Sequence, residues 1–471
     1  MTPPSRQSEA RPGPGPTTDL GNARRFARQY HDTVRYVPEW ETWLRWDGTR
    51  WAPDRCNRAL ELGCEIPRLV LAEAQATRAQ DARTRLTKWA LASESASRIQ
   101  AALSLAKADR RLVVTPERLD AYPHLLNTRS GTVDLRTGEV HDHDPAELHT
   151  RCTGVGLERG DRWPSRFLAF LERILPQPDV RAFVQRAIGY SATASVAEQV
   201  MVIAYGPGAN GKSTLHNVLQ LVLGDYAHQA APDLLLTKRH DTHPTEVAAL
   251  RGRRLVVATE TNEGRRLDSA LVKRLTGGDP ISARFMRQDF FEFVPSHKLW
   301  LACNHLPRVA DHSPAMWRRI RLVPFTVSIP AEERVPDLDR QLVAEEGPAI
   351  LAWIVEGALA WRDQGLDPPP DVMLATETYR QTEDHVEQAL DDVTVTGDGA
   401  AWESSKEIID AYTRWCADNA IPEHQRVTAK ALTDRLTARG ATPDRRKVSG
   451  RTVRGWRGIC LANRIPGGDP W

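Results

Sequence analysis

The sequence is poor in cysteine and has no long apolar run. Its six cysteines are scattered through 471 residues without a CxxC pair, which argues against a disulfide framework or a zinc site and favours reduced thiols. No apolar run approaches the ~20 residues of a membrane-spanning helix. Because the beginning of the chain also lacks a signal-peptide core, we expect a cytoplasmic protein with no membrane partner.

The net charge is also small, and no long internal repeat is present. A formal net charge of +2 means that any nucleic-acid-binding surface must be local. The hydrophobic fraction of 41% and the charged fraction of 26% are typical of a soluble globular protein. The length predicts about three domains.

The stretch Val200–Thr214 carries the clearest chemical signal. It begins as a short apolar run, typical of a buried strand, and continues into apolar residues at helical spacing. The residues in between fill the G-x-x-x-x-G-K-[ST] pattern of a phosphate-binding loop, or P-loop: Gly206, Pro207, Gly208, Ala209, Asn210, Gly211, Lys212, Ser213 and Thr214. A glycine turn before a surface helix is the alternative, but the order of strand, loop and helix favours the P-loop.

The residue types in this loop suit a nucleoside triphosphate. Gly206, Gly208 and Gly211 lack the Cβ atoms that would keep backbone N–H groups away from phosphates. The positive end of the following helix points at the same place. We expect Lys212 to reach the β- and γ-phosphates and the Ser213 hydroxyl to ligate Mg²⁺.

Two later predicted strands end in polar residues that can complete such a site. Leu255–Thr259 is followed by Glu260, a carboxylate that can hold Mg²⁺ through water and polarise the attacking water, with Glu263 as second choice. Lys298–Cys303 is followed by Asn304, whose amide can orient that water. The alternatives are a solvated carboxylate and an ordinary turn residue.

A basic cluster, Trp317–Arg321, overlaps the start of a fourth predicted strand, Arg319–Phe325. A guanidinium can stabilise charge on a transferred phosphoryl group, and in a ring it would act on the neighbouring subunit's nucleotide. A solvated basic cluster is the alternative.

Taken in order, these motifs resemble the ATPase module of superfamily 3 helicases, specifically the phage/plasmid and poxvirus-type primase–helicases. The resemblance rests on the glycine loop, Glu260, Lys273–Asp279, Leu301–Asn304 and Arg318–Phe325. It implies an α/β P-loop NTPase core that is AAA+-like, with an α+β N-terminal domain and a C-terminal winged-helix domain. Roughly residues 21–465 are covered.

The resemblance implies ATP and Mg²⁺ as cofactors and assigns roles in turnover. Lys212 and Ser213 would be the Walker A pair, Glu260 the Walker B acid and Asn304 sensor 1. Arg319 would be the arginine finger, with Arg318 as the next choice.

The resemblance also implies contacts with single-stranded DNA. A predicted hairpin, Ile281–Phe293, resembles the loop that projects into the pore of a ring. The residues expected to bind DNA are Lys273, Arg284 and Arg287 in the motor, and Arg446, Lys447, Arg451 and Arg454 in a basic wing of the tail.

The expected domain organisation follows the same plan. We expect a disordered tail over residues 1–20, an N-terminal domain over 21–160, the ATPase domain with flanking helices over 161–392, a linker over 393–402, and a winged-helix-like DNA-binding domain over 403–471. Because only about twenty residues precede the leading domain, we expect a separate primase or polymerase as partner.

The expected function is an ATP-dependent DNA helicase of a phage, plasmid or integrative element, which translocates on single-stranded DNA as a hexameric ring at a replication fork or origin. The alternative is an ATP-regulated, origin-binding initiator without processive unwinding, in which the basic tail carries specificity. A kinase or GTPase is less favoured because the chain has no N-K-x-D signature.

Overall fold

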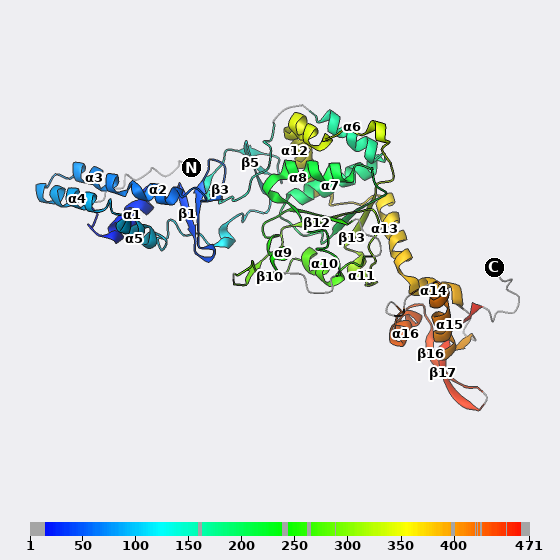
Figure 1. Cartoon of the computed structure of the whole chain (residues 1–471). Coiled ribbons are helices and arrows are strands. Elements are labelled where there is room, and N and C mark those ends of the chain that lie inside the picture. The colour runs from blue at the N-terminus through cyan, green and yellow to red at the C-terminus, as the bar shows by residue number, and fades with distance from the viewer. Residues whose placement is uncertain are drawn as a thin grey trace, which may run out of the picture.

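The computed structural model describes residues 15–158, 163–237, 244–260, 265–287, 289–396, 401–419, 421, 423, 426–448 and 450–462, with the backbone alone for Pro244 and Glu260. Figure 1 shows an N-terminal part at one end, a large sheet covered by helices in the middle, and a smaller C-terminal part at the other end. Within the ranges given above, none of the helices combines the length and the apolarity needed to cross a membrane.

The N-terminal part consists of helices packed beside a small antiparallel sheet. Its elements are α1 (Asp19–Tyr30), β1 (Val34–Val37), β2 (Thr42–Trp46), β3 (Trp51–Pro53), α2 (Arg58–Cys64), α3 (Ile66–Ala76), α4 (Gln80–Ala92) and α5 (Ala96–Ala106). The α1 helix begins inside the segment expected to be a disordered tail, because the Thr18 side chain accepts a hydrogen bond from the Gly21 N–H. Residues 1–14 of that segment lie outside the described residues.

The strands β2 and β3 form a tryptophan-rich hairpin. Trp46 pairs with Trp51 across β2 and β3, and the Trp51 side chain is fully buried. The two indole rings lie 5.6 Å apart. Trp51 therefore serves as core of the hairpin, which leaves its face unavailable for stacking on a nucleic-acid base.

A second antiparallel sheet joins the N-terminal part to the middle of the molecule. It contains β4 (Leu125–Thr128), β5 (Gly131–Asp134) and β6 (Val140–His141). Leu126 and Val133 are fully buried in the same apolar cluster as the helices of the central part. This sheet therefore packs as an extension of the central core.

The central part is a five-stranded parallel sheet in the order β13-β7-β12-β9-β8. Its strands are β7 (Met201–Tyr205), β8 (Ala227–Gln229), β9 (Leu255–Glu260), β12 (Lys298–Cys303) and β13 (Ile320–Pro324). Side chains alternate between two apolar clusters, with Trp300 on one face of β12 and Leu299 and Leu301 on the other. Both faces are buried, as the near-continuous apolar runs of the strands require.

Helices cover the two faces of this sheet (Figure 1). One face carries α6 (Ser165–Ile174), α7 (Pro178–Ala192), α8 (Lys212–Leu223) and α12 (Leu338–Gln364), and the other carries α9 (Pro244–Ala248), α10 (Ser269–Thr276) and α11 (Pro314–Trp317). The α10 helix begins at Ser269. Asp268 caps it by accepting a hydrogen bond from the Leu271 N–H.

The predicted hairpin after α10 is also confirmed. It consists of the antiparallel strands β10 (Ile281–Ala283) and β11 (Phe291–Phe293), with Ile281 opposite Phe293. The turn therefore lies between Ala283 and Phe291, a position that the sequence left open.

The C-terminal part begins earlier than expected. Its elements follow α13 (Pro370–Glu383) and are α14 (His385–Val393), β14 (Thr394–Thr396), β15 (Trp402–Ser404), α15 (Ser405–Asp418), α16 (Ala429–Ala438), β16 (Thr442–Val448), β17 (Arg451–Arg457) and β18 (Ile459–Leu461). The expected linker over 393–402 instead contains β14, which pairs with β18, and the first residue of β15. Val386 and Leu390 of α14 lie in one core with Ile408 and Tyr412 of α15, so the change of core falls between α13 and α14.

Candidate functional site

The strands β7 and β12 lie side by side, and the connections that leave them run in opposite directions across the sheet. From β7 the chain passes through α8 on one face, whereas from β12 it passes through α11 on the other face before entering β13. Adjacent parallel strands whose connections leave on opposite faces form a crevice at their carboxyl ends, where ligands bind in open α/β sheets. The glycine loop, residues 206–211, lies at this point.

Two glycines of the loop are required by its packing, and the third is not. A Cβ atom on Gly206 would lie 2.1 Å from the Phe325 carbonyl oxygen, and one on Gly211 would lie 2.5 Å from Ile174 Cγ2. Gly211 also has a φ of +82°, which favours glycine. Around Gly208 there is open space within 4 Å. Gly208 therefore faces outward, together with the exposed Pro207 and Ala209.

Lys212, the first residue of α8, points back into the loop. It is only 5% exposed, and its ammonium group donates to Gly206 O at 2.6 Å, Asn210 Oδ1 at 3.0 Å and Asn304 Oδ1 at 3.3 Å. All three of its donors are thus engaged. Burial lowers the pKa of Lys212 below its usual value.

Asn210 fixes the loop against the neighbouring strand. Its side chain is buried and donates to Phe325 O at 3.2 Å while accepting from Lys212. The Gly206 N–H donates to Cys303 O at 3.3 Å, at the end of β12. The loop is therefore attached to both strands that flank β7.

The remaining residues predicted for a nucleotide lie at the same edge. Ser213 is exposed and Thr214 half-buried in the first turn of α8. Glu260 is the last residue of β9, with its backbone opposite Cys303. Its side chain and the whole of Glu263 lie outside the described residues. Within the described part of the chain, no three His, Cys, Asp or Glu residues gather to hold a metal.

Arg318 and Arg319 of the basic cluster lie at the opposite edge of the sheet, where the strands begin. The Arg319 carbonyl accepts from the Met201 N–H, at the amino end of β7. The length of β7 therefore separates them from the glycine loop by about 17 Å. Arg319 is 8% exposed and donates to Thr276 Oγ1 at 3.1 Å and to the Ala315 carbonyl, whereas Arg318 is exposed.

The residues predicted for DNA in the motor are in different surroundings. Lys273 forms an ion pair with Asp311 and donates to Ser313 Oγ at 3.3 Å. Arg284 and Arg287 are exposed in the turn of the hairpin, where the Arg284 guanidinium lies 4.7 Å from the centre of the Phe290 ring. Phe290 itself is 60% exposed.

The turn end of this hairpin contacts the N-terminal part through Arg251. The Arg251 guanidinium lies 4.6 Å from the centre of the Trp40 ring and 4.4 Å from the centre of the Phe291 ring. Trp40 precedes β2, and Phe291 is the first residue of β11. A single arginine therefore stacks between two distant parts of the chain.

The predicted basic wing is the ribbon of β16 and β17, which extends away from its domain (Figure 1). Its exposed cations are Arg445, Arg446, Lys447, Arg451, Arg454 and Arg457. Arg445 and Arg454 stand directly opposite each other. The helix α16 differs, because its Arg435 pairs with Asp384 at 3.0 Å and its C-cap residue Arg439 pairs with Glu387 at 2.7 Å.

Sequence reasoning missed a cavity of about 560 Å³ beside the glycine loop. Its lining includes Tyr205, Leu306 and Pro324 from the strand ends and Leu374 and Thr378 from α13. The α13 residues recur every three or four positions, which is a helical signal, but only the fold shows that they face the end of β7.

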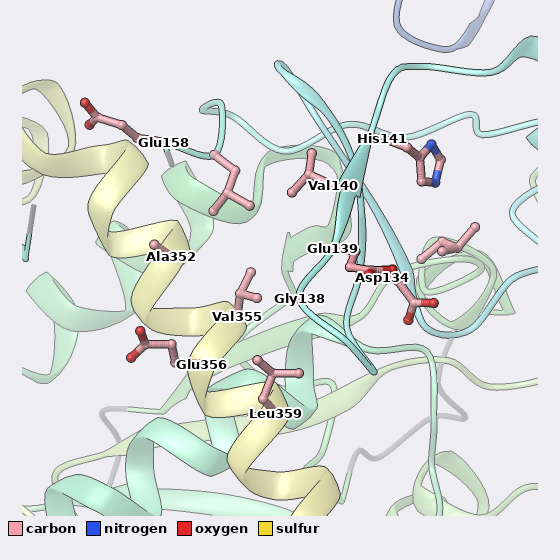
Figure 2. Close-up of a pocket in the computed structure, with 12 residues that line it drawn as sticks. Asp134, Gly138, Glu139, Val140, His141, Glu158, Ala352, Val355, Glu356 and Leu359 are labelled. Carbon is pink, nitrogen blue, oxygen red and sulfur yellow. The ribbon is translucent and has the colours of Figure 1, made fainter. Parts of the chain in front are cut away.

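A second cavity, of about 710 Å³, lies between α12 and the strands β4 to β6 (Figure 2). Val355 lines it from α12 and Val140 from β6, and the carboxylates of Glu139, Glu158 and Glu356 surround it. None of the described residues that line it is a lysine or an arginine. This cavity is therefore unsuited to phosphate.

Comparisons with known proteins confirm the resemblance that the motif order indicated. Residues 23–183 match the family described as D5 N terminal like, and residues 204–319 match a family of unknown function (DUF5906). The chain is similar to the D5-type primase–helicases over these residues.

Its relatives come from large DNA viruses. A protein named "Putative helicase" from Acanthamoeba polyphaga mimivirus is 28% identical over 212 residues, which are 44% of this chain and 22% of that protein. A "Putative helicase" of Frog virus 3 is 27% identical over 250 residues, 49% of this chain and 26% of the relative. A "Putative primase" of African swine fever virus is 23% identical over 328 residues, 64% of this chain and 34% of the relative. The chain thus spans about a fifth to a third of their length.

A solved structure shares the fold over nearly the whole chain. The apo structure of the NrS-1 C-terminal region has a TM-score of 0.53 and 9% sequence identity, and covers 93% of this chain and 99% of that one. An A-form apo structure of the same region has a TM-score of 0.51 and 10% identity, with 90% and 95% covered. At this identity the likeness concerns the fold alone.

Proposed function

We propose that this chain is an ATP-driven DNA helicase of the superfamily 3 type, with an AAA+-like P-loop core. The observation that carries the proposal is the meeting of Lys212 and Asn304 at the carboxyl edge of the sheet. A γ-phosphate site is expected to combine a lysine at the end of a glycine loop with an amide at the end of the neighbouring strand in the sheet. The names of the viral relatives favour the same activity.

The loop fits a triphosphate with Mg²⁺. Lys212 now donates to two amide side chains and a carbonyl, neutral acceptors that an anionic phosphate oxygen would outcompete. Mg²⁺ usually keeps several waters and takes one or two protein ligands besides the phosphates. The exposed Ser213 hydroxyl and the strand-end Glu260 are the residues we assign to it.

The position of the arginines favours a ring. Arg318 and Arg319 are too far from the glycine loop of their own chain to contact the same phosphate. In a closed ring with head-to-tail interfaces, they can reach the nucleotide of the next subunit. Arg318 is exposed and Arg319 is already bonded to Thr276, so Arg318 is the more accessible finger. We keep both as candidates and propose a homohexamer.

We propose two DNA-binding elements. In the pore, the exposed hairpin turn would contact single-stranded DNA through Arg284 and Arg287. In the C-terminal domain, which we propose to be winged-helix-like, the ribbon of β16 and β17 is favoured over α16, because the arginines of α16 are paired within the domain. Lys273 is already paired with Asp311, so its contact with DNA would require that ion pair to break.

The decisive experiment is ATP hydrolysis by the purified protein, with and without single-stranded DNA, across protein concentration. A ring motor with shared active sites should show strong DNA stimulation and turnover that rises more than linearly with protein. Turnover that is slow, DNA-independent and linear in protein would reject the motor. It would favour the alternative, an ATP-regulated replication initiator of a phage, plasmid or integrative element.

A further inference from the structure

Three arginines gather at the amino ends of β8 and β9, opposite the edge of the sheet that holds the glycine loop. Arg251 and Arg253 lie in the turn between α9 and β9, and Arg151 approaches this turn from the connection between β6 and α6. Gly252 makes the approach possible, because a Cβ atom there would lie 2.8 Å from Arg151 Nε. All three arginines are half-buried, so part of each side chain remains accessible to a ligand.

The guanidinium groups of this arginine cluster lie close together. Arg151 Nη1 and Arg253 Nη1 both donate to the Asp225 carbonyl oxygen, at 3.1 Å and 2.6 Å. Arg151 Nη2 donates to the Arg251 carbonyl oxygen at 2.7 Å. Burial, followed by the charge of Arg151, lowers the pKa of Arg251 and lowers that of Arg253 to about 10. Glu39 offsets only part of this shift for Arg251.

The positive charge of the cluster is not compensated within the described part of the chain. None of the three arginines forms an ion pair there, and the Asp225 carboxylate pairs with Arg50 instead. The Nε atoms of Arg151 and Arg253 are buried and have no hydrogen-bond partner among the described residues. Clustered guanidinium groups with unused donors are suited to the oxygens of a phosphate, which accept charge-assisted hydrogen bonds from several donors at once.

Arg251 connects the cluster to the turn end of the β10–β11 hairpin. Its guanidinium lies 4.4 Å from the centre of the Phe291 ring, and the Arg284 guanidinium lies 4.7 Å from the centre of the adjacent Phe290 ring. Arginines and aromatic rings therefore alternate from the exposed turn to Arg253. Such a series is typical of surfaces that bind single-stranded nucleic acid, where cations contact the phosphates and rings contact the bases.

We propose that Arg151 and Arg253 bind phosphates of a single DNA strand that also contacts the hairpin turn. The inference rests on the proposed DNA helicase function and deepens it, because it places a DNA contact outside both the hairpin and the C-terminal ribbon. Arg254, the next residue in the sequence, has a different role. It is 2% exposed and donates to the carbonyl oxygens of Ala192 and Leu125, at 2.8 Å and 2.7 Å, and is therefore structural.

The test measures how the binding of a fluorescent oligo-dT to the full chain depends on salt concentration. Arg253→Gln should reduce the slope of log K against log salt by about 0.7 for each phosphate contact that is lost. Arg253→Lys keeps the charge and should keep the wild-type slope. Arg78→Gln is the matched control and should also keep it, because Arg78 is an exposed arginine between α3 and α4. Fluorescence anisotropy measures all four proteins.

The other outcomes overturn the inference. A wild-type slope in Arg253→Gln would mean that the strand passes elsewhere, and an equal reduction in Arg253→Lys would mean that Arg253 only supports the turn. If pyrophosphate raises the Tm of wild type more than that of Arg253→Gln while the slopes agree, the cluster binds a free anion instead of DNA.

Failure of the proposed function would look different, because wild type itself would then not bind oligo-dT. Should Arg253→Gln not fold, Arg151→Gln replaces it, with the same expected reduction of the slope.

Discussion

The ammonium nitrogen of Lys212 lies 3.3 Å from the Oδ1 atom of Asn304, which follows 92 residues later in the chain. The contact joins the start of α8 to the end of β12. From β12 the chain continues through α11 to Arg318, at the opposite edge of the sheet. A ligand that draws the Lys212 ammonium away from Asn304 would therefore remove a contact at the start of the segment that leads to Arg318, the proposed arginine finger.

The glycines of the loop should separate structural from binding roles. We expect Gly206→Ala to destabilise the protein by about 1–3 kcal/mol, because its Cβ would meet the Phe325 carbonyl, and Gly208→Ala to leave stability unchanged but weaken MgATP binding. Thermal unfolding and calorimetric titration measure the two effects. A stable Gly206→Ala variant would contradict the packing argument.

Lys212 and Arg318, at opposite ends of the strands, should contribute to one active site from two neighbouring subunits. Lys212→Ala and Arg318→Ala should each lose ATP turnover about 10³-fold or more while remaining folded. Mixing the two variants should restore part of the turnover, because about a quarter of the interfaces in a mixed ring would combine an intact Lys212 with an intact Arg318. Replacing Arg318→Ala by Arg319→Ala in the mixture identifies the finger, and absence of any recovery in both mixtures would contradict the shared site. Exposed Lys88→Ala is the control for loss of a lysine.

Variants of the β16–β17 ribbon and of α16 should differ in how strongly their DNA binding depends on salt concentration. Arg454→Ala on β17 should weaken duplex binding and reduce the slope of log K against log salt by about 1, since it removes one phosphate contact. Arg435→Ala on α16 should leave that slope unchanged and lower stability, because Arg435 is paired with the buried Asp384. Fluorescence anisotropy across salt concentration tests both, and the reverse pattern would assign the contact to α16.

Stability should fall as the pH drops below about 6.5, owing to buried histidines. His216 is 2% exposed, neither of its ring nitrogens has a hydrogen-bond partner among the described residues, and burial followed by the charge of Lys212 lowers its pKa to about 4. The unfolded value is about 6.5, so between these values the unfolded chain binds more protons and stability rises with pH, by up to about 1.4 kcal/mol per pH unit.

Replacing this histidine should flatten the pH profile. Urea unfolding at pH 7 and pH 5 should show a smaller loss for His216→Leu than for wild type. The exposed His305→Leu serves as control and should behave as wild type. Equal losses in His216→Leu and wild type would show that His216 does not titrate in this range.

Local patterns predicted four of the five strands of the central sheet, missed the short edge strand β8, and placed the domain boundary poorly. The expected bounds of β12 match the structure, because all its residues are buried and the run ends abruptly at polar Asn304. The linker over 393–402 failed because β14 is a strand only through pairing with β18, far along the chain. Such non-local pairing leaves no signal in a short window of sequence.

The candidate site could be predicted in its residue types but not in its surroundings. The glycine loop and Asn304 follow from spacing and order. Its surroundings depend on elements that are distant in sequence. Arg319 is hydrogen-bonded to Thr276, Arg435 is paired within the C-terminal domain, and α13 forms a cavity with Tyr205.

The Arg251 guanidinium, held between Trp40 and Phe291, has a mechanical consequence. Because each such stacking contact is worth about 0.5–2 kcal/mol, the hairpin cannot slide past the N-terminal part without breaking one of them. Arg251 thus couples the position of Phe291, at the turn end of the hairpin, to that of Trp40 in the N-terminal part.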